Sequence, residues 1–446
     1  KINLNYTLIM NNTIQFKKHI YNLRSIEIIY FFKYLNKHYS DYAVLGDLSD
    51  FPKKITSDVD IYINFKKIDE IKRFIKKLAT KRKLKISNIF KHQYNSYFFV
   101  LSKKYKNDYF YIYIDICNSF TAKNVELIDF STLKKKKVTL QNTYYLTLNK
   151  KDNAYYYFCK KIFKGHIDNK GYKYLKNNLK SLYLNNFLNS KDKDIISNIF
   201  KYKNYYKFIE NIKILRIIFK KGCERNYIKE LKRVLFRAKF DTGFHVAFIG
   251  VDGSGKSTQI SNILKSNLKY LFRETKVYHL YNKQVGQKNK KIIPYQKSYG
   301  QLLSLLKIFY LYIMFLKGYY LDILFLKKKS NLIFNDRCHY DTIIDPKRFG
   351  IYHSYNVLNF IFKFLPKPDM VFFLNTSGKK ILERSDELPK EILFNNIQKY
   401  ENFAKKNKFI FNLKLNKSIN KLSEIITNEI YKRINHKTIK LFLNLK

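Results

Sequence analysis

A glycine-rich segment in the second half of the chain has the residue types and spacing needed to hold phosphate groups. It reads Gly-Val-Asp-Gly-Ser-Gly-Lys-Ser-Thr over residues 250–258, fits the pattern G-x-x-x-x-G-K-[ST], and lies between an apolar run and a segment of helical spacing. The glycines let successive backbone N–H groups turn onto phosphate oxygens, and the following helix adds the positive end of its dipole. We expect Lys256 to contact the β- and γ-phosphates of a nucleotide and Ser257 to ligate Mg²⁺. A simple glycine turn is disfavoured by the flanking strand and helix. The expected nucleotide-binding residues are Gly250, Gly253, Ser254, Gly255, Lys256, Ser257 and Thr258.

The segments around this loop alternate between strand and helix. Strands are predicted at residues 246–249, 276–281, 332–337, 368–374 and 408–413, and helices at residues 259–264, 302–326, 379–384 and 423–433. This alternation predicts an α/β fold with a parallel sheet and helices on both faces. Ligands of such sheets bind beyond the carboxyl ends of the strands, where the glycine loop and the pair Asp336-Arg337 both fall.

The loop and the Asp-Arg pair together resemble the thymidylate kinase family of P-loop kinases, over residues 244–433. The resemblance implies transfer of the γ-phosphate of ATP to an acceptor, with Lys256 and Ser257 on the phosphates and Mg²⁺. It also implies that Asp252 faces the acceptor and that Asp336 lies near Mg²⁺. Arg337 would contact the acceptor phosphate, and Arg384 would cover the transferring phosphoryl group as a lid arginine. The alternative for Arg384 is an ordinary arginine on a helix surface.

The residues after Asp336-Arg337 depart from the common pattern of that family. Cys338 stands where an aromatic residue is usual, and the segment that follows resembles a divergent branch with Asp-Arg, then Asp, then Asp-Pro-x-Arg. Pro389 and Tyr400 match the same branch. Asp341, Asp345 and Arg348 are therefore acceptor-binding candidates, and the alternative is a salt-bridged loop. The departures also indicate that the acceptor need not be thymidylate.

Three carboxylates in the first half of the chain follow a glycine turn at Gly46. Asp58 and Asp60 are two residues apart on a predicted strand, so both point to one face, and Asp115 lies in a later apolar strand. The pattern resembles nucleotidyltransferases of the polymerase-β type, and the resemblance implies that the three acids hold Mg²⁺ and align a nucleoside triphosphate. Asp47 replaces the small residue that is usual beside the triphosphate, which puts nucleotidyl transfer by this domain in question. The alternative is that Asp58 and Asp60 are exposed strand residues.

The composition is strongly basic. The chain has 446 residues and a formal net charge of +53. Such an excess suggests nucleic acid or an anionic membrane, but the lysines are scattered and accompany residues with A/T-rich codons, so genome composition accounts for much of the bias. The four cysteines are far apart and contain no C-x-x-C pair, which favours a reduced, cytoplasmic location without zinc. No signal peptide is recognisable.

The most apolar stretch covers residues 302–326. Lys307, Lys317 and Asp322 interrupt it, so we expect a long buried helix and no membrane span.

These patterns divide the chain into three segments. We expect an α+β nucleotidyltransferase-like domain over residues 1–150, a helical connector over residues 151–240, and a thymidylate kinase-like P-loop domain over residues 241–446.

The function expected from the sequence is an ATP- and Mg²⁺-dependent phosphotransferase. The acceptor would be a nucleoside monophosphate or another small phosphorylated or hydroxylated molecule. One alternative is nucleotidyl transfer by the N-terminal carboxylates, and another is a non-catalytic nucleotide-gated protein that binds nucleic acid. A homodimer is compatible with the sequence.

Overall fold

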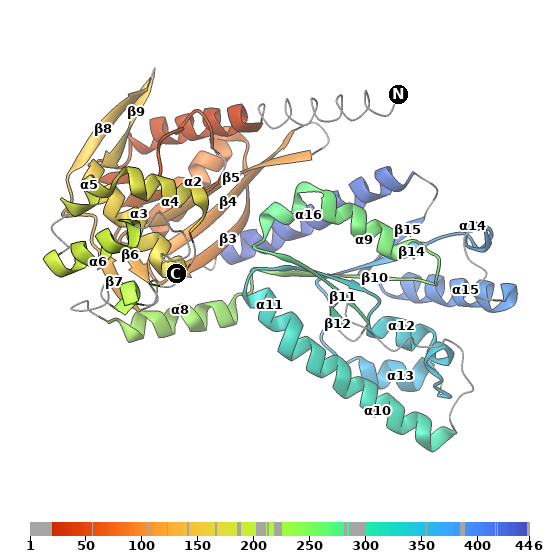
Figure 1. The fold of residues 1–446 in the computed structure, drawn as a ribbon. Coiled ribbons are helices and arrows are strands. Elements are labelled where there is room, and N and C mark those ends of the chain that lie inside the picture. Colours follow the sequence, from red (N-terminus) through yellow and green to blue (C-terminus); the bar gives the residue numbers. More distant parts are fainter. Residues whose placement is uncertain are drawn as a thin grey trace, which may run out of the picture. The chain divides into compact units, whose positions relative to one another are not determined.

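The computed structural model divides into two compact units (Figure 1). Unit 1 comprises residues 1–105, 110–239 and 439–446, and unit 2 comprises residues 106–109 and 240–438. The structure describes residues 20–55, 57–105, 108–122, 124–140, 142–165, 167–184, 189–201, 211, 214–217, 225–280, 283–284, 300–353, 355–383, 389–414, 416 and 418–443.

Unit 1 is built on a mixed seven-stranded sheet in the order β3-β4-β5-β2-β1-β9-β8. These strands are β1 (Tyr42–Leu45), β2 (Val59–Ile63), β3 (Lys85–Gln93), β4 (Ser96–Tyr105), β5 (Asp108–Cys117), β8 (Lys135–Leu140) and β9 (Thr143–Leu148), and a separate pair is formed by β6 (Phe120–Ala122) and β7 (Val125–Ile128). Strand β2 pairs antiparallel with β1 and parallel with β5. The sheet therefore places the residues of β2 and β5 side by side. Strands β3, β8 and β9 were not anticipated from the sequence.

Helices cover both faces of this sheet, because its strands bury residues on both sides. They are the helix over residues 20–35, α2 (Ile68–Arg82), α3 (Lys150–Lys164), α4 (Asn169–Asn177), α5 (Leu179–Tyr183), α6 (Ser190–Lys201) and α8 (Tyr227–Lys239). One core joins Val44 and Ile61 to α2, and a second joins Ala43 and Tyr62 to α3. Alternate residues of β1 and β2 thus face opposite cores, as strand geometry requires.

Unit 2 contains a six-stranded sheet in the order β12-β11-β13-β10-β14-β15. The strands are β10 (Phe244–Ile249), β11 (Thr275–His279), β12 (Lys283–Gln284), β13 (Leu332–Asp336), β14 (Met370–Asn375) and β15 (Ile410–Lys414). All neighbours pair in parallel except β12, which is antiparallel to β11. Strand β10 is buried along its whole length. The predicted α/β class with a parallel sheet is confirmed.

Helices lie on both faces of the unit 2 sheet (Figure 1). They are α9 (Lys256–Lys265), α10 (Gln301–Gly318), α11 (Leu324–Lys328), α12 (His339–Ile344), α13 (Tyr355–Phe362), α14 (Gly378–Leu382), α15 (Lys390–Lys406) and α16 (Ile419–Leu443), with shorter turns at Asn267–Leu271, Tyr319–Ile323 and Pro346–Phe349. Ala247 and Ile249 of β10 join the core formed with α10, α12, α13 and α15, and Phe248 stacks on Phe372 at 5.4 Å between ring centroids.

The long apolar helix differs from its prediction. Ile308, Leu311 and Phe315 of α10 are buried, but Leu302 is 74% exposed and Ile313 is 60% exposed. The expectation of a buried helix is therefore wrong for the outer face, because the apolar positions surround the helix while only one stripe meets the core. Residues Gln301–Lys328 are long and apolar enough to cross a bilayer by length and composition, criteria that a core helix of a soluble protein also meets.

A buried histidine in α12 makes unit 2 sensitive to acid. His339 packs against the rings of Phe315 and Tyr340, and burial lowers its pKa to about 3. Between pH 6.5 and 3 the unfolded chain binds a proton that the folded chain does not, so stability falls with falling pH by about 1.4 kcal/mol per pH unit. We expect denaturant unfolding of the full chain to show that, between pH 7 and 4.5, His339→Phe loses less free energy of unfolding than the wild type. The exposed His436→Gln serves as a control with the wild-type dependence, and equal slopes in both variants would contradict the prediction.

Candidate functional site

The phosphate-binding loop leaves the end of β10 and enters α9 at Lys256. Gly250 has φ 145° and Gly255 has φ 90°, a region that L-residues with side chains rarely adopt. A Cβ on Gly250 would lie 3.3 Å from the carbonyl oxygen of Leu374. Glycine is required here both for the backbone turn and for the approach of β14.

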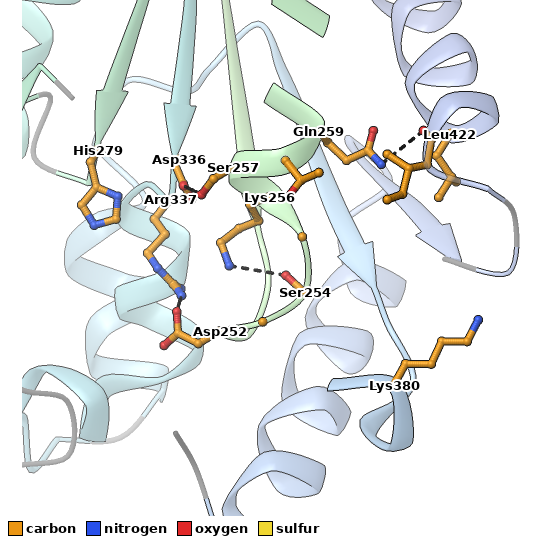
Figure 2. A pocket seen from close by; sticks show the side chains of 14 residues that line it. Asp252, Ser254, Lys256, Ser257, Gln259, His279, Asp336, Arg337, Lys380 and Leu422 are labelled. Carbon is orange, nitrogen blue, oxygen red and sulfur yellow. Dashed lines mark hydrogen bonds and ion pairs between the residues drawn. The ribbon is translucent and has the colours of Figure 1, made fainter. Parts of the chain in front are cut away.

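Lys256 points back into the loop. Its Nζ donates hydrogen bonds to the carbonyl oxygens of Gly250 and Val251, at 3.0 and 2.8 Å, and lies 3.4 Å from Ser254 Oγ (Figure 2). Burial lowers the pKa of Lys256 to about 8, and the nearby Arg337 acts in the same direction. The loop thus holds a cation whose ammonium group is hydrogen-bonded to carbonyl oxygens of the loop itself.

Ser257 and Asp336 meet at the carboxyl end of the sheet. Phe248 of β10 pairs with Asp336 of β13, and the Ser257 hydroxyl donates to Asp336 Oδ2 at 2.5 Å. Asp336 Oδ1 is buried and has no hydrogen-bond partner among the described residues. A hydroxyl and a carboxylate with an unused buried oxygen fit Mg²⁺, whose preferred ligands are oxygens.

Asp252 lies between two arginines. Its carboxylate is ion-paired with Arg337 and with Arg348, and Figure 2 shows Asp252 and Arg337 pointing toward one another beside the loop. Burial alone would raise the pKa of Asp252, but the two guanidinium groups outweigh it and hold that pKa well below its usual range. The sequence candidates Asp252, Arg337 and Arg348 are therefore brought together.

The other acidic candidates of this segment have partners within the protein. Asp341 is fully buried and accepts hydrogen bonds from Tyr400 Oη at 2.7 Å and from Arg337 Nη1 at 3.2 Å. Asp345 accepts from Asn396 Nδ2 at 3.2 Å and from the backbone N–H of Arg348 at 3.4 Å. Asp341 therefore orients the guanidinium group of Arg337, and Asp345 orients the backbone of Arg348. Arg384 lies outside the described residues.

The glycine loop, Asp252, Asp336 and Arg337 border a cavity of about 590 Å³, and Arg348, Asp341 and Asp345 are not among its lining residues. His279, Lys380, Gln259 and Leu422 also line it and were not singled out from the sequence. His279 ends β11 beside Asp336, so its position at the carboxyl end of a parallel strand was the available signal. The parallel sheet and the loop after its central strand are consistent with a P-loop kinase fold.

The three N-terminal acids also come together. Asp60 of β2 pairs with Asp115 of β5, and one carboxylate oxygen from each of Asp58, Asp60 and Asp115 lies within 4.8 Å of the others. Three converging carboxylates fit a divalent cation in the chemistry of their donor atoms. Lys160 of α3 is ion-paired with Asp60. Burial would lower the pKa of Lys160, but Asp60 outweighs it and raises that pKa well above its usual value.

This carboxylate cluster borders a second cavity, also of about 590 Å³. Its cationic lining residues are Lys160, Lys164 and Arg216. Asp47, which replaces the small residue usual beside a triphosphate, is not among its lining residues. Its carboxylate accepts from Ser49 Oγ at 2.8 Å and is paired with Lys170 at 3.3 Å.

No protein-family model matches the chain, and no curated protein matches it. Among solved structures, thymidylate kinase from Candida albicans is similar at 20% identity, with 44% of this chain and 93% of that chain covered and a TM-score of 0.32. Thymidylate kinase from Ehrlichia chaffeensis is similar at 14% identity, with 42% and 98% covered and a TM-score of 0.31. These values are too low to support an argument about activity.

The lowered pKa of Lys256 predicts a pH dependence. Because the phosphates of a nucleotide attract the protonated form, affinity for a fluorescent ATP analogue should fall by up to about tenfold per pH unit above pH 8. Titrations between pH 7 and 9.5 test this. Lys380→Met, which changes another lysine of the same cavity, should keep the wild-type profile. Constant affinity across this range would contradict the assignment of the titrating group to Lys256.

Proposed function

We propose that unit 2 transfers the γ-phosphate of ATP to a small phosphorylated or hydroxylated acceptor, such as a nucleoside monophosphate. One observation carries the proposal: the phosphate-binding loop, the Ser257–Asp336 pair and the Asp252–Arg337 pair border the same cavity. Phosphoryl transfer is catalysed mainly by positioning and by stabilising charge, and this cavity has groups for both tasks.

On the donor side, the loop receives the ATP phosphates. The backbone N–H groups and the N-terminus of α9 face the anion, and Lys256 exchanges the carbonyl oxygens of Gly250 and Val251 for phosphate oxygens. Ser257 and Asp336 would hold Mg²⁺, which when bound neutralises charge on the phosphate oxygens.

On the acceptor side, Arg337 and Arg348 are the anion-binding groups. Their guanidinium groups are oriented by Asp341 and by the turn that Asp345 caps, and both reach Asp252. A phosphorylated acceptor would share these arginines with Asp252, whose carboxylate can then accept a hydrogen bond from an acceptor hydroxyl. Arginine suits this role because its donors match two phosphate oxygens at once.

A second candidate function belongs to unit 1. The convergence of Asp58, Asp60 and Asp115 beside a cavity with three cationic side chains favours nucleotidyl transfer there. In that function the acids would hold the metal, and the cations would bind the triphosphate.

Separate substitutions distinguish the two functions. If unit 2 is the kinase, Lys256→Met should reduce ADP formation from ATP with an acceptor by at least about a hundredfold, while Asp60→Asn should leave it within about twofold. A coupled assay for ADP, run over a panel of nucleoside monophosphates, measures both. Nucleotidyl transfer releases pyrophosphate and not ADP, so a pyrophosphate assay is run in parallel. Pyrophosphate release that is lost in Asp60→Asn and retained in Lys256→Met, without acceptor-dependent ADP formation, would assign the main activity to unit 1.

The acceptor side has its own test. Arg348→Met should raise KM for a phosphorylated acceptor by about ten- to a hundredfold, because a charged hydrogen bond contributes about 1.5–3 kcal/mol, and KM for ATP should change little. Its neighbour Lys347→Met is the control, because Lys347 is exposed. A rise in KM for ATP alone would contradict the acceptor role.

A further inference from the structure

The cavity of unit 1 contains a cation of the protein itself beside its carboxylates. Lys160 Nζ contacts Asp60 Oδ2, on the same carboxyl group that lies in register with Asp115. The carboxylates of Asp58, Asp60 and Asp115 are close enough to share one cation. An ammonium is thus already bound where a divalent metal would have to approach.

The position of Lys160 follows from helix α3. Tyr156, Lys160 and Lys164 are four residues apart, so they lie on one side of the helix, and all three line the cavity. Asn149 caps the N-terminus of this helix, and Gly165 caps its C-terminus. Near that end, Arg216 Nε donates to the carbonyl oxygen of Ile162 at 2.9 Å. Two further cations, Lys164 and Arg216, thus line the same cavity as Lys160.

The charged side chains of the cavity allow Lys160 to exchange one ionic partner for another. Three carboxyl groups lie beside one ion-paired ammonium, that of Lys160, while Lys164 and Arg216 have no carboxylate ion pair among the described contacts. An anion bound near Lys164 and Arg216 would offer Lys160 a second partner. When Lys160 turns to that anion, the carboxylates become available to a divalent cation.

We propose that Lys160 gates the carboxylate cluster of unit 1, excluding a divalent metal until a phosphate-bearing ligand draws its ammonium away from Asp60. Metal and ligand then bind with positive cooperativity, since each favours the arrangement in which Lys160 has left the carboxylates. The gate belongs to unit 1 and does not depend on phosphoryl transfer by unit 2.

The first test measures Mn²⁺ binding to the full chain by electron paramagnetic resonance, without nucleotide. Asp336→Asn serves as background to silence the site of unit 2. In this background Lys160→Met should bind Mn²⁺ at least about tenfold more tightly, because a competing positive charge is removed. Adding Asp60→Asn should abolish the gain. Lys170→Met is the matched control, because Lys170 pairs with Asp47 outside the cavity.

Unchanged or weaker Mn²⁺ binding in Lys160→Met would overturn the gate. Lys160→Gln is a second variant for the case that Lys160→Met does not fold, as judged by circular dichroism, and the same outcomes apply to it. Kinase activity is not the readout, so a failed gate and a failed kinase assignment remain distinguishable.

The second test measures pyrophosphate binding in EDTA by calorimetry, in a Lys256→Met background that silences the loop of unit 2. Asp60→Asn should strengthen binding when Lys160 is present, because the ammonium no longer has to leave a carboxylate. When Lys160→Met is also present, Asp60→Asn should strengthen pyrophosphate binding less. The difference between the two effects measures the coupling between Asp60 and Lys160. Equal effects of Asp60→Asn in both backgrounds would show plain charge repulsion and overturn the exchange of Lys160.

Discussion

The ion pair between Asp252 and Arg337 connects the parts of the unit 2 site. Asp252 belongs to the phosphate-binding loop, and Arg337 follows β13, so the pair links segments that are 85 residues apart. Arg337 also donates to the carbonyl oxygen of Gly250 at 3.1 Å. A nearly buried guanidinium is stable only when its donors are satisfied, and Asp341 completes that requirement. The loop, β13 and α12 therefore depend on one another.

The same requirement restricts what the cavity can bind. Two cations that line it already have acceptors within the protein: carbonyl oxygens for Lys256, and the carboxylates of Asp252 and Asp341 for Arg337. A phosphate must therefore exchange with these acceptors. Replacing a protein acceptor by a phosphate oxygen costs less free energy than leaving a cation unpaired, since each cation keeps a partner throughout. Lys160 in unit 1 is held in the same manner by Asp60.

Much of the unit 2 site was predictable from the sequence because it is local. The loop, the strand before it and the helix after it are consecutive, and Asp336-Arg337 directly ends a strand. The parallel sheet then required these strand ends to lie together. The exposed face of α10 was not predictable, because composition gives the apolar character of a helix and not the number of faces that meet a core. Strand β8 was missed for a related reason, since its lysine-rich sequence leaves a weak apolar signal.

The sequence by itself determined the phosphate-binding loop, the α/β alternation and the pairing of Asp58 with Asp60, because each follows from residues near one another along the chain. Only the tertiary structure decided that Asp341 and Asp345 are bonded to Tyr400 and Asn396, that His279 and Lys380 line the cavity, and that Lys160 pairs with Asp60 of the carboxylate cluster. Lys160 and Asp60 are 100 residues apart, and their contact depends on how α3 packs against the sheet of unit 1. Such contacts are set by packing between distant segments, for which a single sequence carries no local signal.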